Sequence, residues 1–520
     1  MSKRSGAFIG RSKSTITAAL ATQLLIGAAA AQEPSGTKSE VVSEAGSTDF
    51  RLGGYVRGWV SFNLQNPPET AENDRGDLSM VRGSVLLDAD LKTGPFNWKG
   101  VARVDREYKT KYLERLETLN ATNTPGGPGS RIMDTYNHGD IRELYVDYAP
   151  NDRLKFRLGR QQVVWGETDF FRAMDVVHGF DYRWRSFLER ENEELRKPLI
   201  LLNAKVDVPE ANGSLQALVR PGWDRDKDIG NTYDLSGGRW ALQPNKGVDF
   251  LAPGLLRYNY HHSSGDVDDV TGGLRWSGTA GPVNYSVAYL KTFNNDPVVN
   301  SSFVPYGTAP AAGLGEFIYP KIDVVGLTAS GYVPALDAVL SSELVYTRDA
   351  AFNVGTNFMS GALPGFGGIK RKNVVQAMFR MDKSLNLTRV LGTSRPSFFS
   401  VQVFDKWIQS YDRADDLVDN AGYGGPLKRH STIVTGVLAL NYTNDKINPM
   451  LAVGTDATNG GGFVIPSVEF VWGNNWRLVA EADLFFSRHQ KQPGQIEGET
   501  HLFGWFKNNN QLLFRLTRQF

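Results

Sequence analysis

The strongest constraint on this chain is a period-two alternation of apolar and polar residues that recurs along most of its length. Apolar or small residues occupy the odd positions of 81–92 and the even positions of 476–486, and charged residues fall between them. Successive side chains of a β-strand point to opposite faces, so this pattern predicts strands with one apolar and one polar face.

The alternation predicts about 18 strands. They lie near residues 52–64, 81–92, 96–107, 141–149, 154–163, 199–208, 213–222, 270–277, 283–293, 321–333, 338–348, 371–382, 397–407, 430–442, 447–455, 463–473, 476–486 and 510–520. Short turns and long polar loops join them alternately, as in bacterial outer-membrane barrels, although the connection 383–396 is long on the short side. Because an open sheet edge in lipid leaves unpaired N–H and C=O groups, we expect an all-β fold: a closed antiparallel transmembrane barrel.

The phase of the alternation predicts the two surfaces of the barrel. We expect the lipid-facing residues to include Val85, Leu87, Leu478 and Leu484. We expect the lumen-facing residues to include Asp88, Glu481 and Asp483.

The N-terminus resembles a secretory signal. Four basic residues precede the apolar run 16–28, and three alanines end at Ala31. We therefore predict a cleaved signal peptide over 1–31, a short periplasmic segment over 32–49, and the barrel over 50–520. A signal peptide and a barrel together predict the outer membrane of a Gram-negative bacterium.

Composition argues against several classes of protein. The absence of cysteine excludes thiol catalysis and disulfides. The chain holds 57 basic and 56 acidic residues, so no bulk field attracts nucleic acid. Its seven histidines include no metal-spaced pair, and no Gly-x-Ser-x-Gly elbow occurs, so we expect no enzyme and no cofactor.

The run GRQQVVWGETDFF (159–171) opens a connection, 164–198, that is unusually long and aromatic for a solvated loop. Apolar surface of this size should pack on something. Within 183–197, the residues that fall on one helical face are Trp184, Phe187, Leu188 and Leu195, and Pro198 stops any helix. We predict a partly helical loop folded into the lumen as a constriction.

The same residues resemble a known family. GRQQVVWGETDFFRAMDVV followed by FLERENEELRKPLILLNAKV is similar to the signature of a proteobacterial outer-membrane family with only a domain-of-unknown-function label. His178-Gly179-Phe180 departs from that family's usual Asn-Pro. The resemblance implies a barrel related in style to porins and hydrophobic-compound transporters, often encoded near efflux-type machinery. The C-terminal QLLFRLTRQF resembles the strand that the barrel assembly machinery reads, although Arg518 stands where an apolar residue is usual.

The constriction supplies the candidate site, with three readings left open: a plug fixed to the wall, direct substrate contact, and catalysis. The candidate residues are Arg160, Gln161, Trp165, Glu167, Phe170, Phe171, Trp184, Phe187, Glu193 and Arg196. We expect Arg160 and Glu167 to pair with ionic partners from this set or from the wall: Arg196, Glu193, Arg57, Arg103 or Asp105. Gly159 and Gly166 should allow close approach or positive φ at the strand exit.

Asp224, Asp226 and Asp228 have the spacing of a calcium-binding loop, but the glycine and the glutamate of such a loop are not in place. We therefore favour a solvated acidic loop here and keep a calcium site as the weaker alternative. The scattered basic residues form no traceable ladder, so the sequence does not indicate an anion-selective porin.

These observations predict an outer-membrane channel or transporter for small hydrophobic or amphipathic molecules, because an apolar ligand needs aromatic walls with few polar anchors. The alternative is a sealed barrel that anchors or docks a periplasmic or efflux-type complex. The expected partners are outer-membrane lipid, lipopolysaccharide and the assembly machinery, with no nucleic acid.

Overall fold

The computed structural model describes residues 48–66, 72–123, 125–126, 128–168, 171–185, 189, 192–234, 239–240, 256–301, 315–355, 367–418, 426–488 and 502–520. The predicted signal peptide 1–31, residues 32–47 of the predicted periplasmic segment, and the candidate residues Phe170 and Phe187 lie outside these ranges.

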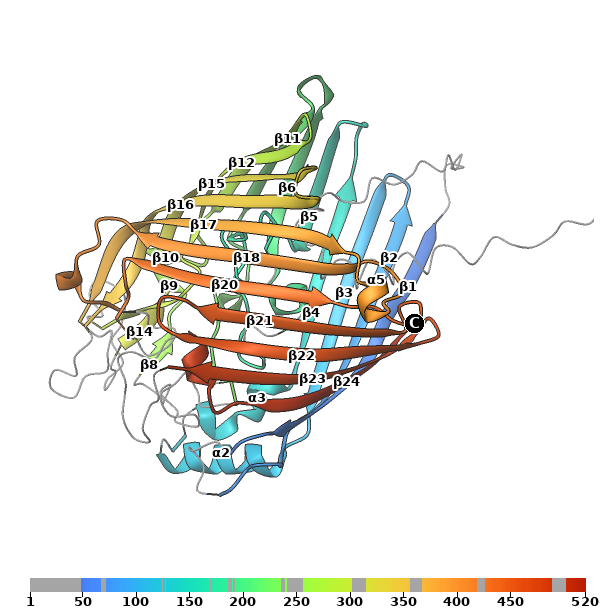
Figure 1. Cartoon of the computed structure of the whole chain (residues 1–520). Coiled ribbons are helices and arrows are strands. Elements are labelled where there is room, and N and C mark those ends of the chain that lie inside the picture. The colour runs from blue at the N-terminus through green and yellow to red at the C-terminus, as the bar shows by residue number, and fades with distance from the viewer. Residues whose placement is uncertain are drawn as a thin grey trace, which may run out of the picture.

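Eighteen described strands close into one antiparallel barrel (Figure 1). The first nine are β1 (Asp49–Asn63), β2 (Leu78–Thr93), β3 (Phe96–Glu107), β4 (His138–Tyr148), β5 (Leu154–Gln161), β6 (Leu199–Val208), β7 (Gly213–Arg220), β11 (Thr271–Ala280) and β12 (Val283–Phe293). The other nine are β15 (Lys321–Val333), β16 (Ala338–Val354), β17 (Ile369–Leu385), β18 (Ser397–Ile408), β20 (His430–Ala439), β21 (Ile447–Asp456), β22 (Gly461–Trp472), β23 (Trp476–Ser487) and β24 (Gln511–Gln519).

Pairing of the first and last strands closes the ring. β1 and β24 run antiparallel from Tyr55↔Gln519 to Asn63↔Gln511, so neither strand leaves an open edge there. The two-residue strand β19 (Leu417–Val418) adds to the same sheet by pairing with the end of β16. The predicted closed barrel of about 18 strands is confirmed.

The connections at the two ends of the barrel differ in length, as the sequence predicts. Turns such as 94–95, 281–282 and 473–475 lie at one end, and the long connections lie at the other. The connection 386–396 is long on the short side, where it forms α5 (Thr388–Leu391). The connection 457–460 is short on the long side, which is a second exception to the alternation of short turns and long loops.

The long connections carry most of the remaining structure. These elements are α2 (Lys111–Asn123), α3 (Met133–Tyr136), α4 (Asn192–Leu195), β8 (Leu256–Tyr258), β9 (His261–His262), β10 (Gly265–Asp266), β13 (Val298–Asn300) and β14 (Gly315–Ile318). Figure 1 shows α2, α3 and the short strands gathered toward one end of the barrel, with α5 and the C-terminus at the other. Among the described residues, no helix combines the length and apolar character needed to cross a membrane.

The burial pattern confirms the predicted phase of the strands. On β23, Glu481 and Asp483 are buried, whereas the alternate residues, including Leu478 and Leu484, lie on the outer side. On β2, Val85 and Leu87 are exposed on the outer side and Asp88 lies in the opposite phase.

Aromatic residues ring the outer surface beside the short turns. The exposed members are Phe96, Trp98, Tyr148, Tyr332, Trp472, Trp476 and Phe520. A closed antiparallel barrel with an apolar outer face and such a girdle is the architecture that spans the bacterial outer membrane, where the short turns face the periplasm. The chain is therefore an outer-membrane barrel.

We expect Leu344→Arg to destabilise the barrel by about 2–4 kcal/mol, since Leu344 lies on the outer face near the middle of β16, beside Leu327 of β15. The measurement is denaturant unfolding of protein refolded into lipid vesicles. The matched control is Leu336→Arg in the 334–337 turn, where Leu336 is also exposed and the same change should cost little. Equal costs at both positions would contradict a lipid-facing Leu344.

Candidate functional site

The connection between β5 and β6, residues 162–198, contacts the inner wall of the barrel on widely separated strands. We call it the inner segment. Its only helix among the described residues is the single turn α4, so the predicted helix over 183–197 is shorter than the apolar spacing suggested. Contacts with the wall hold most of its described length.

Two glycines allow the chain to leave β5 and turn inward. Gly159 has a φ of +131°, and a Cβ at this residue would lie 2.3 Å from the carbonyl oxygen of Leu144. A Cβ at Gly166 would lie 2.8 Å from the amide nitrogen of Asp175. A larger residue would force the backbone to shift at either place, which confirms the expected positive φ or close approach.

Trp165 anchors the start of the inner segment. Its side chain is fully buried, and its indole N–H donates a hydrogen bond to Oε1 of Gln216 on β7 at 3.0 Å. It belongs to a buried apolar cluster with Met174 of the same segment and Val324 of β15. This position makes Trp165 a packing residue between segment and wall.

Glu343 on β16 holds the next turn of the inner segment. Its carboxylate accepts hydrogen bonds from the backbone amides of Glu167 and Met174, the latter at 2.7 Å. Arg380 on β17 donates to the carbonyl oxygen of Glu167 at 3.1 Å. Buried backbone N–H and C=O groups outside a sheet need hydrogen-bond partners, and here the side chains of Glu343 and Arg380 provide them for the inner segment.

Burial raises the pKa of the Glu167 carboxyl to about 7, although Arg275 and Arg380 oppose the shift. A group whose pKa rises on docking binds its proton more tightly in the docked state. It therefore stabilises docking below its ordinary pKa of 4.5, and this contribution is lost as the pH rises through about 7.

We accordingly expect residues 165–174 to be better protected from hydrogen exchange at pH 6 than at pH 8, after correction for the intrinsic exchange rate. Glu167→Gln removes the titrating group and should abolish most of this difference. An unchanged pH dependence in Glu167→Gln would assign it to another group.

Ion pairs fix the end of the inner segment to the first strands. Arg57 on β1 lies 2.6 Å from Glu194, and Arg103 on β3 lies 3.5 Å from the same carboxylate. Arg142 on β4 donates to the carbonyl oxygens of Glu193 and Arg196. Inward arginines thus occur on β1, β3 and β4, a row that the sequence pattern did not reveal.

The middle of the inner segment is bound to the last two strands. Arg185 contacts Glu481 and lies 3.6 Å from Asp483, both on β23. Arg515 on β24 lies 3.3 Å from Glu189. Trp184 packs edge-on against Trp59 of β1, with ring centroids 5.4 Å apart.

The predicted ionic partners of Arg160 are wrong, because Arg160 pairs with neither Glu193 nor Asp105. Arg160 projects toward Asp228 at 2.6 Å and Asp140 at 3.6 Å, because it lies at the end of β5 beside the β7–β11 connection. Arg196 instead pairs with Asp175 at 2.7 Å.

Two further candidates have different surroundings from those expected. Gln161 is buried and donates to the carbonyl oxygen of Leu201 at 2.9 Å, which fixes β5 to β6. The partners predicted for Glu167 are also wrong, since the arginines near its carboxyl are Arg275 and Arg380.

The three carboxylates of the weak calcium candidate are engaged separately. Asp224 pairs with Arg220 at 3.0 Å, Asp228 with Arg160 and Arg225, and Asp226 lies 3.4 Å from His261. The structure therefore does not bring them together as one ligand set.

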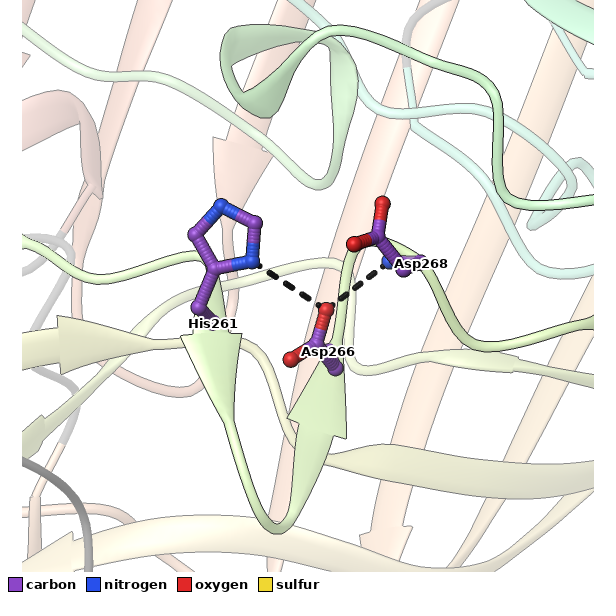
Figure 2. Close-up of side chains that lie close together, drawn as sticks. All are labelled: His261, Asp266 and Asp268. Atoms are coloured by element: carbon purple, nitrogen blue, oxygen red, sulfur yellow. Dashed lines mark hydrogen bonds and ion pairs between the residues drawn. The ribbon is translucent and has the colours of Figure 1, made fainter.

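A different acidic cluster lies on the β9–β10 hairpin. Figure 2 shows His261, Asp266 and Asp268, whose possible ligand atoms lie within 4.8 Å of one another. Asp266 Oδ1 lies 3.2 Å from His261 Nδ1 and accepts a hydrogen bond from the amide of Asp268 at 2.9 Å. These mutual contacts account for the arrangement of this largely exposed group.

A cavity of about 280 Å³ lies between the inner segment, the connections that follow β7 and β12, and the wall formed by β15 to β18. Its main apolar lining residues are Phe171, Val176, Tyr182, Ile322, Phe352 and Val374. Its charged lining residues are Arg172, Asp296 and Lys406. Of the candidate residues, Phe171 lines this cavity, whereas Trp165 and Trp184 pack elsewhere.

Several site residues were not among the candidates. Glu343, Arg380 and Lys406 are charged residues in the inward phase of predicted strands, and that phase was the one available signal. Arg172 lies within the predicted constriction but belongs to no aromatic or paired pattern.

A family model described as "Protein of unknown function (DUF1302)" matches residues 5–520. No curated protein matches the sequence.

Three solved structures from Acinetobacter baumannii are similar over nearly their whole length. OccAB2 has 11% identity and a TM-score of 0.45, covering 91% of this chain and 98% of that one. OccAB3 has 7% identity and a TM-score of 0.47, covering 91% and 99%. OccAB1 has 10% identity and a TM-score of 0.45, covering 93% and 99%.

Proposed function

We propose that this chain, which belongs to the DUF1302 family of proteins of unknown function, is an outer-membrane channel for small apolar or amphipathic molecules. The inner segment is its constriction, and the cavity beside Phe171 is where the passing molecule binds.

The cavity is the observation that carries this proposal. Its walls combine aliphatic and aromatic side chains with almost as much polar surface, which comes from three charged side chains and several amides, and such a mixed lining suits an amphipathic organic molecule. A closed cavity of about 150 Å³ suffices for benzene, so about 280 Å³ can take a molecule of roughly two fused rings.

The position of the inner segment supports a constriction. Barrels of 16–18 strands ordinarily enclose an aqueous channel. Here the segment contacts β1, β7, β16 and β23, so its backbone and side chains occupy space that such a channel would need.

Single-channel recording with a neutral two-ring probe tests the proposal. In planar bilayers, 2-naphthamide should interrupt the ion current of the mature protein reversibly, whereas sucrose should not. Phe171→Ala should shorten the interruptions about tenfold, because Phe171 packs on Phe404 and Phe503 at the cavity. Phe50→Ala on the outer surface of β1 is the matched control and should behave like the wild type.

A folded barrel that shows no conductance and no response to the probe would contradict the channel. The role as a sealed anchor or docking partner of a periplasmic or efflux-type complex would then explain the protein better.

A further inference from the structure

We propose that the cavity recognises organic anions: it binds a carboxylate on an apolar body, with Arg172 and Lys406 as the two cations that receive the acid group. This inference rests on the proposed channel function and specifies its substrate class.

Arg172 provides the first unmatched charge. Its Nη1 atom is buried, and the guanidinium makes no hydrogen bond or ion pair within the part of the chain that the structure describes. Its Cζ atom lies 3.3 Å from the ring centroid of Phe180 and 5.6 Å from that of Tyr182. Stacking holds the flat group by its face and leaves Nη1 without a partner in the described structure, and a planar guanidinium of this kind can bind a carboxylate through two N–H groups.

Arg172 remains charged despite this environment. Burial lowers its pKa to about 10, opposed by the acidic residues Asp175 and Asp296. At neutral pH the guanidinium is therefore almost entirely cationic.

Lys406 provides the second unmatched charge. It projects from the inward phase of β18, and its Nζ atom lies 5.1 Å from the ring centroid of Phe352. Within the described ranges it makes no ion pair and no side-chain hydrogen bond.

Gln376 brings the two cations to one side of the cavity. It lies directly opposite Lys406 in the β17–β18 register, and its Nε2 donates to the carbonyl oxygen of Arg172 at 3.5 Å. Directly opposed residues on neighbouring strands have Cβ atoms about 5 Å apart. All three residues line the cavity, so one small anion can approach both cations.

The acidic residue at the cavity does not cancel this charge. The Asp296 carboxylate accepts hydrogen bonds from Asn231 at 2.8 Å and from the Tyr233 hydroxyl at 2.5 Å, and within the described residues no ion pair joins it to Arg172 or Lys406. Among the described lining residues, two cations and one carboxylate leave a surplus of one positive charge, which a monoanion balances.

Three other arginines inside the barrel show how a buried cation is paired here. Arg196 lies 2.7 Å from Asp175, Arg220 lies 3.0 Å from Asp224, and Arg380 lies 2.8 Å from Asp382. A partly buried cation without such a partner is costly unless a ligand supplies one. Arg172 and Lys406 differ from these three in facing the cavity.

A charge series on one apolar body tests the inference. We expect detergent-purified mature protein to bind 2-naphthoate at least tenfold more tightly than 2-naphthamide, and 2-naphthylmethylammonium most weakly, by isothermal titration. Arg172→Gln and Lys406→Gln should each reduce the affinity for 2-naphthoate about tenfold and leave that for 2-naphthamide nearly unchanged. Arg371→Gln, an exposed cation on β17 outside the cavity lining, is the matched control.

Equal affinities for the acid and the amide in the wild type would overturn the inference without any variant. A preference for the acid that survives both Arg172→Gln and Lys406→Gln would overturn it as well. In either case, current interruptions by 2-naphthamide would leave the proposed channel intact, whereas a sealed barrel would remove the channel but not the binding preference.

Discussion

Deleting residues 168–195 is expected to raise the single-channel conductance several-fold. The deletion removes Phe171, Trp184 and Arg185 from the interior, together with their contacts to β18, β1 and β23. An 18-strand ring without an internal loop has room for an aqueous path. Recording in planar bilayers measures the effect directly.

Two controls separate an open lumen from a damaged barrel. The deletion variant must keep its heat-modifiable gel migration and β-sheet circular dichroism. A second variant, in which Gly and Ser residues replace 168–195 at equal length, should give a raised but noisy conductance, since the chain remains while its wall contacts are lost. A folded deletion variant that conducts like the wild type would show that the inner segment does not limit the path.

Arg185→Ala is expected to cost about 3–5 kcal/mol of docking free energy for the inner segment, because it leaves buried acidic groups without their cation. Arg185 and its partners Glu481 and Asp483 are all nearly inaccessible to solvent. The loss should appear as faster hydrogen exchange over residues 171–185, while the barrel strands change little.

A charge-removal series checks this explanation. Arg185→Met combined with Glu481→Gln and Asp483→Asn removes both sides of the interaction with β23, while Glu189, which also lies 3.5 Å from Arg185, keeps Arg515 as its cation. The triple variant should restore most of the protection lost in Arg185→Ala. If the triple variant is as poorly protected as Arg185→Ala, the effect comes from packing of the arginine stem and not from unpaired charge.

The barrel could be predicted from the sequence because each strand carries its own signal. The phase of residues 476–486 alone places Glu481 and Asp483 inside and Leu484 outside, and the structure agrees. The alternation of short and long loops then gives the direction of each strand. Because lipid offers no hydrogen-bond partner to the backbone groups of an open sheet edge, the sheet must close into a barrel.

The contacts of the inner segment could not be predicted in the same way. Arg160 had several acidic residues within plausible reach, and its partner Asp228 lies 68 positions away in another connection. Glu343 bears a single charge in an ordinary strand pattern, and its role appears only when two loop amides reach it. Alternation identifies which residues face the lumen, but the pairing of those residues depends on how the loop crosses it.

The cavity was also beyond sequence reasoning, for a related reason. Aromatic content suggested Trp165 and Trp184 as ligand contacts, yet both are used to pack the segment. Phe171 alone of the described candidates reaches the cavity, where it meets wall residues from strands β15 to β18. Composition shows that apolar surface must be buried but not which of it remains available to a ligand.

The inner segment also bears on how the ring holds together where its two ends meet. Its Glu194 is bound by Arg57 on β1, and its Glu189 by Arg515 on β24, so it bridges the strands that carry the chain termini. Glu189 and Arg515 are 326 residues apart in sequence, and this ion pair can form only after the last strand has joined the barrel. Separating β1 from β24 must therefore break the ion pairs of Glu194 and Glu189 as well as the backbone hydrogen bonds between the two strands. The inner segment therefore strengthens the contact between β1 and β24 that closes the barrel.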